Sequence, residues 1–114
     1  MPSDDVAIQR WLNDIQHHIG MAQGFVAGMS YETFKNDNLH LYAVTRCLEI
    51  ISEASRRLPP DFKQRFPEIP WKEVAGSGGI YRHNYENVQS LRIWRTIHEA
   101  LPALRAVVDA AFQA

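Results

Sequence analysis

The residues best suited to chemistry lie in one short segment, Gly76-Ser77-Gly78-Gly79-Ile80-Tyr81-Arg82-His83-Asn84-Tyr85. Arg82 offers a cation for phosphate, His83 can exchange a proton near neutral pH, and Tyr85 carries a phenol. Three glycines within ten residues are costly in a helix, so the backbone here has a reason to be irregular. We predict that any chemical site lies here. The alternative is a histidine packed at a helix junction, beside an arginine that reaches solvent and a partly buried tyrosine.

A second polar group lies on the second long helix that the sequence predicts. Four charged residues follow one another at steps of three and four, so they share one helix face: Arg46, Glu49, Glu53 and Arg57. Two interpretations stay open. In the first, these side chains form ion pairs on a solvated face. In the second, the face lies opposite His83, and Glu49 or Glu53 orients the imidazole.

Other kinds of site are not indicated. The remaining histidines lack the spacing of a zinc pair, and Cys47 is the single cysteine, so we expect no metal site. The glycine cluster lacks the following lysine and serine or threonine of a phosphate loop. Gly-x-Ser-x-Gly, the motif of a nucleophile elbow, does not occur. We therefore predict no cofactor.

The first half of the chain predicts two long helices. Apolar residues recur at steps of three and four from Val6 to Val26, and again from Leu41 to Leu58. We expect Gly28 to end the first helix and Pro59-Pro60 to stop the second. Ser30 can cap a short helical turn between them.

The second half predicts a single turn around Phe62 and Phe66, a short helix over 80–87 and a long helix over 88–112. Pro102 lies within the last helix, so we expect a kink or a restart there. No segment alternates with period two, so we predict no sheet. The fold class is all-α, an antiparallel bundle of four to five helices. Three tryptophans and small-residue faces suit a dimer interface, and tryptophans placed in the core account for them equally well.

Composition sets the broad class. The 114 residues suit one domain, 1–114, and 46% hydrophobic residues support a core. A net charge of −1 argues against a surface coated in positive charge for long nucleic acid, but allows a small anion site. The single cysteine suits a reducing compartment. Without a signal pattern or an apolar run of about 20 residues, we expect a cytoplasmic protein that does not cross a membrane.

Four motifs follow one another along the chain: Phe34–Asp37 with Ala43–Ala54, Phe66–Gly76, His83-Asn84-Tyr85, and Trp94 with Leu101–Leu104. In this order they resemble the second-helix signature, the proline–tryptophan segment, the His-x-Tyr and the closing helix of the HepT-like branch of the HEPN superfamily. The resemblance covers nearly the whole chain and implies one HEPN-like domain.

This resemblance implies the toxin of a toxin–antitoxin pair, with a minimal nucleotidyltransferase as the antitoxin. The implied activity is metal-independent RNA cleavage, with His83 as the acid or base and Arg82 as the cation near the phosphate. It also implies a homodimer with the active site at its interface. A two-fold axis would bring two copies of His83 together. Tyr85 matches the tyrosine that the nucleotidyltransferase modifies with AMP.

The sequence departs from the family's motif at one position. In the motif, four to six residues separate an arginine from the histidine of His-x-Tyr, and here Gly78, separated from His83 by four residues, stands at that position. The nearest arginine is Arg82, so whether the chain is an enzyme stays open. The alternative is a catalytically inactive HEPN module that binds a nucleotidyltransferase or a nucleotide without cleaving RNA. A helical interaction protein without nucleotide chemistry is the third interpretation. Which RNA would be cut, and whether assembly stops at a dimer, are not given by the sequence.

Overall fold

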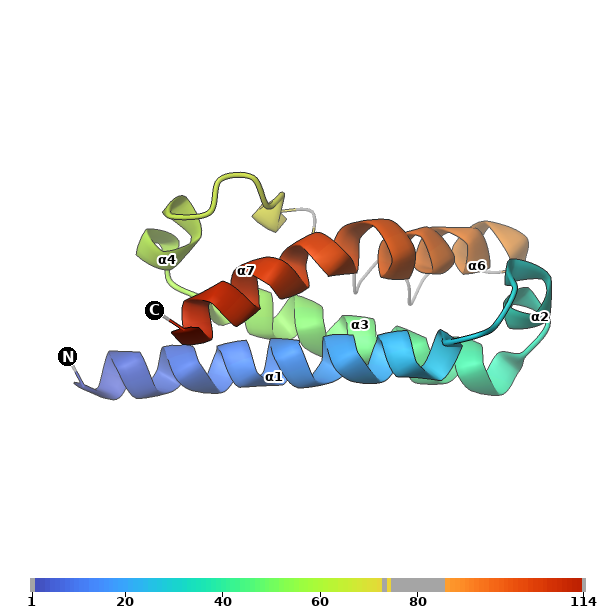
Figure 1. Cartoon of the computed structure of the whole chain (residues 1–114), viewed down its shortest axis with the longest axis horizontal. Helices are drawn as coiled ribbons and strands as arrows, with labels where there is room; N and C mark the ends of the chain where they lie inside the picture. The colour runs from blue at the N-terminus through green and yellow to red at the C-terminus, as the bar shows by residue number, and fades with distance from the viewer. Residues whose placement is uncertain (1, 73, 75–85, 114) are drawn as a thin grey trace.

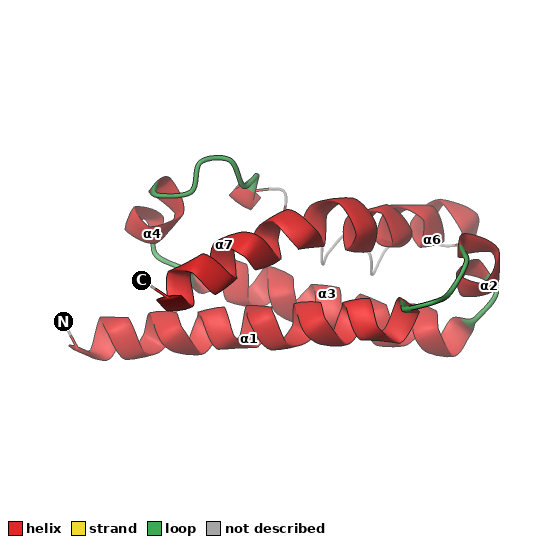
Figure 2. Cartoon of the chain, viewed as in Figure 1, coloured by secondary structure: helices red, strands yellow, loops and turns green. Residues whose placement is uncertain are grey.

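A computed structural model describes residues 2–72, 74 and 86–113; residues 1, 73, 75–85 and 114 lie outside the described part. Within the described residues every regular element is a helix, which confirms the all-α fold class (Figure 2). The elements are α1 (Pro2–Val26), α2 (Tyr31–Lys35), α3 (Asn38–Arg57), α4 (Pro60–Gln64), α6 (Glu86–Arg95), the π-helical turn η1 (Thr96–Ala100) and α7 (Leu101–Gln113).

The long helices lie side by side as a bundle (Figure 1). Helix α1 runs antiparallel to α3, and the two form the most extensive helix pair. Helices α6 and α7, joined through η1, form one rod that runs in the same direction as α3. Short α2 closes one end of the bundle, and α4 lies beyond the other end of α3.

The predicted apolar stripes form the core. Helix α1 buries Leu12, Ile15, Ile19, Ala22 and Val26, and α3 buries Val44, Cys47, Leu48, Ile51 and Ala54. Burial of apolar side chains stabilises the pairing at roughly 25 cal/mol per Å² removed from water. Val6 departs from the predicted stripe and is 69% exposed, because the first turns of α1 extend beyond α7 (Figure 1).

The helix boundaries follow local chemistry. Gly28 has φ +79°, a left-handed conformation that glycine adopts without strain, and it follows the end of α1. The Ser30 hydroxyl accepts the Thr33 N–H at 3.1 Å and caps α2, as predicted. Asp37 caps α3 in the same way by accepting the His40 N–H at 3.1 Å.

Pro102 is the second residue of α7, so the last predicted helix is divided and restarts there. The proline has no N–H, and its ring crowds the carbonyl four residues earlier. The π turn η1 lies directly before it, and the Leu101 N–H donates to the Thr96 carbonyl five residues back. This wider turn adds one residue to the helical repeat, so the rod continues into α7. The expected restart is therefore confirmed, and a π turn separates α6 from α7.

The segment after α3 is fixed by aromatic contacts. The rings of Phe62 and Phe66 lie 5.2 Å apart, as their four-residue spacing predicted. The Trp71 indole N–H donates to the carbonyls of Lys63 at 3.2 Å and Phe66 at 3.0 Å. Trp71 therefore ties this turn together immediately ahead of Val74.

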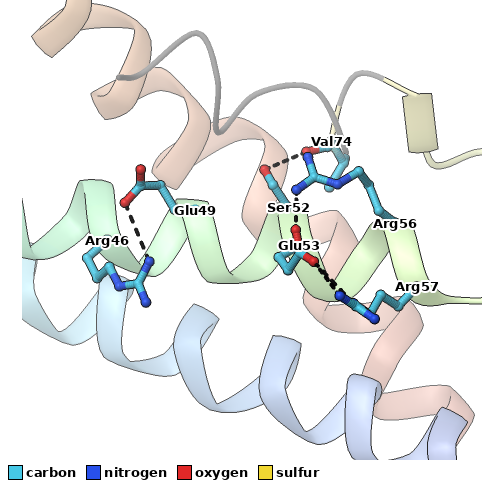
Figure 3. Close-up of polar contacts among 7 residues, drawn as sticks. All are labelled: Arg46, Glu49, Ser52, Glu53, Arg56, Arg57 and Val74. Atoms are coloured by element: carbon cyan, nitrogen blue, oxygen red, sulfur yellow. Dashed lines mark hydrogen bonds and ion pairs between the residues drawn. The ribbon is translucent and has the colours of Figure 1, made fainter. Parts of the chain in front are cut away.

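One hydrogen bond attaches this segment to α3. The buried Ser52 hydroxyl donates to the Val74 carbonyl at 2.8 Å (Figure 3). After residues 75–85, the chain is held again where the hydroxyls of Ser90 and Tyr31 lie 3.0 Å apart. The two described ends of the glycine-containing segment are thus attached to α3 and to α2.

We predict that Ser52→Ala lowers the free energy of unfolding by about 1–3 kcal/mol, because the Val74 carbonyl loses this donor in a largely buried place. Urea unfolding followed by circular dichroism measures the change. Ser55→Ala is the matched control, since the Ser55 hydroxyl is buried on the same helix and has no hydrogen-bond partner among the described residues. It should be neutral or stabilising. Equal losses in the two variants would show that the bond to Val74 does not hold the segment.

Candidate active site

The residues predicted to do chemistry lie outside the described part of the structure. Arg82, His83 and Tyr85, together with Gly78, fall within 75–85. The structure describes the predicted supporting face on α3 and the two attachment points of the segment. The described part of the candidate site therefore consists of this face of α3 and the two attachment points.

The predicted polar face of α3 divides into two groups (Figure 3). Arg46 Nη1 lies 3.8 Å from Glu49 Oε1. One turn further along, Glu53 is bound by two arginines: Arg57 lies at 3.0 Å through Nη2 and 3.1 Å through Nε, and Arg56 pairs with the other carboxylate oxygen. Ion pairs within the helix thus occur, as the first interpretation predicted.

The two glutamates have different surroundings. Hydrogen bonds, first from Arg56 and then from Arg57, hold the pKa of the Glu53 carboxyl below its usual value. Glu53 is therefore an ionised group already occupied by two cations. The Glu49 side chain is only 20% exposed, against 72% for Arg46, its partner in the longer pair. Glu49 is the more sheltered carboxylate of the face.

Glu49 and Ser52 lie on the same side of α3. Both side chains rise from the helix toward the side on which Val74 lies, whereas Arg46 and Arg57 extend the other way (Figure 3). Because Ser52 holds Val74, the described chain that leads into residues 75–85 is attached beside Glu49, one turn away.

Sequence analysis missed two contributors to this face. Arg56 follows Glu53 by three residues, an ordinary ion-pair spacing that could have been recognised. Ser52 has a weaker signal: it is a small polar residue among the buried positions of α3, between Leu48 and Ser55. A buried hydroxyl at such a position needs a partner, but the sequence does not say which carbonyl it meets.

Other reactive side chains are placed differently. Burial raises the pKa of the Cys47 thiol and makes it a core residue, not a nucleophile. His18 and His98 each have Nδ1 within hydrogen-bond distance of a carbonyl one turn earlier in their helices, at 2.7 and 2.9 Å. Across residues 2–72, 74 and 86–113, no three metal-ligating side chains come together as a candidate site. Among the helices the structure describes, none has the length and apolar character needed to span a membrane.

Comparisons with known proteins agree with the motif order. The family model described as ribonuclease HepT-like matches residues 15–111. A "putative RNase" of Methanocaldococcus jannaschii is 37% identical over 105 residues, covering 92% of this chain and 85% of that protein. The "probable ribonuclease HepT" of Thermococcus cleftensis is 39% identical over 95 residues, covering 83% and 86% of the two chains.

A third relative, a "putative RNase" of Caldanaerobacter subterraneus, is 39% identical over 88 residues, covering 77% of this chain and 79% of that protein. No solved structure gives a significant match. The matched region contains α3, the Trp71 turn, the glycine-containing segment and α6. The chain belongs to the HepT-like ribonuclease family.

Proposed function

We propose that this protein is a metal-independent endoribonuclease, the toxin of a pair whose antitoxin is a minimal nucleotidyltransferase. The observation that carries the proposal is the family match over residues 15–111 in a chain that keeps His83 and Tyr85 at the His-x-Tyr positions. RNA is the substrate class because the relatives are named as ribonucleases. Residues 1–114 would act as one HEPN-like domain in the cytoplasm, where a single cysteine stays reduced.

The proposed reaction uses a nucleophile that the RNA itself supplies. The 2′-oxygen attacks the neighbouring phosphorus while a base removes the proton of the 2′-hydroxyl. The bond from phosphorus to the 5′-oxygen breaks, and an acid delivers a proton to the leaving 5′-oxygen. His83 moves these protons, a contribution typically worth ~10²–10⁴-fold in rate. Arg82 stabilises negative charge on the phosphoryl oxygens. No step needs a metal ion.

Glu49 is the carboxylate best suited to orient His83. Glu53 is bound by two arginines, whereas Glu49 is sheltered and lies on the side of α3 that carries Ser52 and Val74. A carboxylate that accepts a ring N–H fixes the imidazole tautomer and favours the protonated form. We therefore assign the positioning role to Glu49 and a structural role to Glu53.

His83→Ala should reduce RNA cleavage by at least about 10²-fold while the bundle stays folded. Glu49→Gln should lower kcat by about tenfold and move the His83 pKa in the pH–rate profile downward, because a negative neighbour is lost. Glu53→Gln is the matched control, and its kcat should stay within about twofold of the wild-type value. Rates are measured on a labelled RNA without added metal. Cleavage by His83→Ala at the wild-type rate would show that the site is assigned to the wrong residue.

A second function is favoured by one observation: Gly78 stands where the motif has arginine. In this alternative the protein is an inactive HEPN module that binds the nucleotidyltransferase or a nucleotide. A folded wild type that does not cleave, together with a Gly78→Arg variant that does, would identify such a degenerate site.

We also propose that the active form is a homodimer, paired through α3. Leu39, Tyr42 and Arg46 follow at steps of three and four, and each side chain is more than 70% exposed. Glu49 follows Arg46 by three residues, at the edge of this stripe. Large exposed apolar side chains beside a candidate site indicate an interface. A two-fold axis there would supply the second histidine that acid–base catalysis requires.

Tyr42→Arg should convert the dimer to a monomer in sedimentation velocity, because the two-fold axis would bring a new positive charge into the interface twice. RNA cleavage should fall by about tenfold or more at the same protein concentration. Val6→Arg adds the same charge at another exposed apolar position and should leave the dimer intact. An unchanged dimer in Tyr42→Arg would exclude this face.

The antitoxin would act on Tyr85. Transfer of AMP to the phenol adds negative charge and bulk two residues from His83, which repels the RNA phosphate. With a minimal nucleotidyltransferase and ATP, the Tyr85 oxygen would attack the α-phosphorus and pyrophosphate would leave. The mass of the wild type should rise by one adenylyl group, and its cleavage should stop. Tyr85→Phe should stay unmodified and active, and Tyr81→Phe, four residues earlier, is the control that should still be modified. Modification of Tyr85→Phe would show that another residue is the acceptor.

A further inference from the structure

Trp11 of α1, which is partly buried against the core, lies beside two guanidinium groups. The Arg10 guanidinium carbon is 5.7 Å from the centroid of the Trp11 ring, and that of Arg57 is 5.3 Å away. Arg10 neighbours Trp11 on α1, whereas Arg57 reaches the ring from the last residue of α3. Together with Arg56, these residues form what we call the Arg–Trp patch: Arg10, Trp11, Arg56 and Arg57.

The arginines of the Arg–Trp patch are held in place. Arg57 contacts the Trp11 ring and donates to Glu53 through Nε and Nη2, so these contacts leave its Nη1 to meet a ligand. Arg56 is held by the same carboxylate. The side chains of Arg56 and Arg57 are both about half exposed. Guanidinium groups ordered before binding lose less conformational entropy when a ligand arrives.

The charge of the patch differs from that of the whole chain. The patch holds three guanidinium groups, and the one carboxylate that pairs with Arg56 and Arg57 is Glu53, in a protein whose net charge is −1. Guanidinium groups match phosphate oxygens in geometry and charge. The Trp11 indole is partly exposed and has two guanidinium groups against its ring, and a nucleobase can stack on such an arginine–aromatic surface, which an acidic peptide would not use. The combination fits single-stranded nucleic acid better than an acidic protein segment.

We propose that the Arg–Trp patch is a second RNA-binding site, which holds the strand outside the cleavage site. Phosphates would contact Arg10 and Arg57, and a base would stack on Trp11. This inference deepens the proposed ribonuclease function. Arg57 follows Glu49 by eight residues on α3, so it lies ~12 Å further along the helix axis. The Glu49 and Arg57 side chains lie on different sides of α3, so a strand that reaches both would pass around the helix (Figure 3).

The test separates binding from cleavage. Wild-type protein is titrated into a labelled single strand of about 12 nucleotides whose 2′-hydroxyls are methylated, which removes the proposed nucleophile. Fluorescence anisotropy gives Kd at several salt concentrations. Arg10→Gln/Arg57→Gln should raise Kd by about tenfold and reduce the slope of log K against log salt by about 1.4, or 0.7 for each lost phosphate contact.

The matched control removes the same charge elsewhere. Lys35 pairs with Glu32 on α2, and Arg105 lies 3.9 Å from Asp109 on α7, so both are paired cations outside the patch. Lys35→Gln/Arg105→Gln should change Kd by less than about twofold. A separate measurement follows the indole: unlabelled RNA should quench part of the tryptophan fluorescence, and Trp11→Phe should remove that quenching while Trp71 and Trp94 remain.

Unchanged affinity in Arg10→Gln/Arg57→Gln, or equal losses in the two double variants, would overturn the proposal. Absence of RNA binding by the wild type would overturn it as well. If the patch variant keeps RNA binding but no longer binds the purified nucleotidyltransferase, the surface belongs to a protein partner instead. Patch-dependent binding without cleavage of unmodified RNA would support this inference and contradict the proposed ribonuclease.

Discussion

The packing of α1 against α3 is the constraint on which the rest of the structure depends. Buried aliphatic side chains from both helices meet along most of their length, which fixes the rotation of α3 about its own axis. Once that rotation is fixed, the remaining side chains of α3 each point in a defined direction. Ser52 meets Val74, Glu49 rises on the same side, and Arg57 reaches back across to Trp11. The direction of the polar face of α3 is thus a consequence of hydrophobic packing.

Hydrogen bonds and ion pairs fix the parts of the chain that lie outside the apolar core. The Ser52–Val74 hydrogen bond and the Trp71 indole fix the chain up to the start of the glycine-containing segment. These are hydrogen bonds of largely shielded groups, so losing one costs more than an exposed surface bond would. The Glu53 ion pairs are exposed and screened by water, and their main effect is to hold two guanidinium groups in a fixed direction.

The fold was predictable because the spacing of apolar residues in an amphipathic helix identifies the face that is buried. The apolar stripes of α1 and α3, the Ser30 cap and the Phe62–Phe66 turn all depend on residues within a few positions of one another. The π turn before Pro102 was not predicted, because more than one local rearrangement can accommodate a proline. Two contacts join residues far apart in the sequence: Ser52 meets Val74 across 22 residues, and Arg57 meets Trp11 across 46 residues. No local sequence pattern encodes such contacts. The motif around His83 predicts a site from the sequence alone, on residues outside the described part, whereas the proposal of Glu49 over Glu53 rests on the surroundings of the two carboxylates in the structure.

The missing motif arginine changes how the chain would have to bind phosphate. With Gly78 at that position, the segment proposed to be catalytic has Arg82 as its cation, and a single guanidinium gives weaker attachment to a polyanion than a cluster does. A patch of ordered arginines elsewhere on α1 and α3 offers attachment without any requirement on the catalytic geometry. Binding strength and transition-state stabilisation would then be divided between two places on one helix pair. Such a division would let the catalytic segment lose a cation while the chain keeps its hold on RNA.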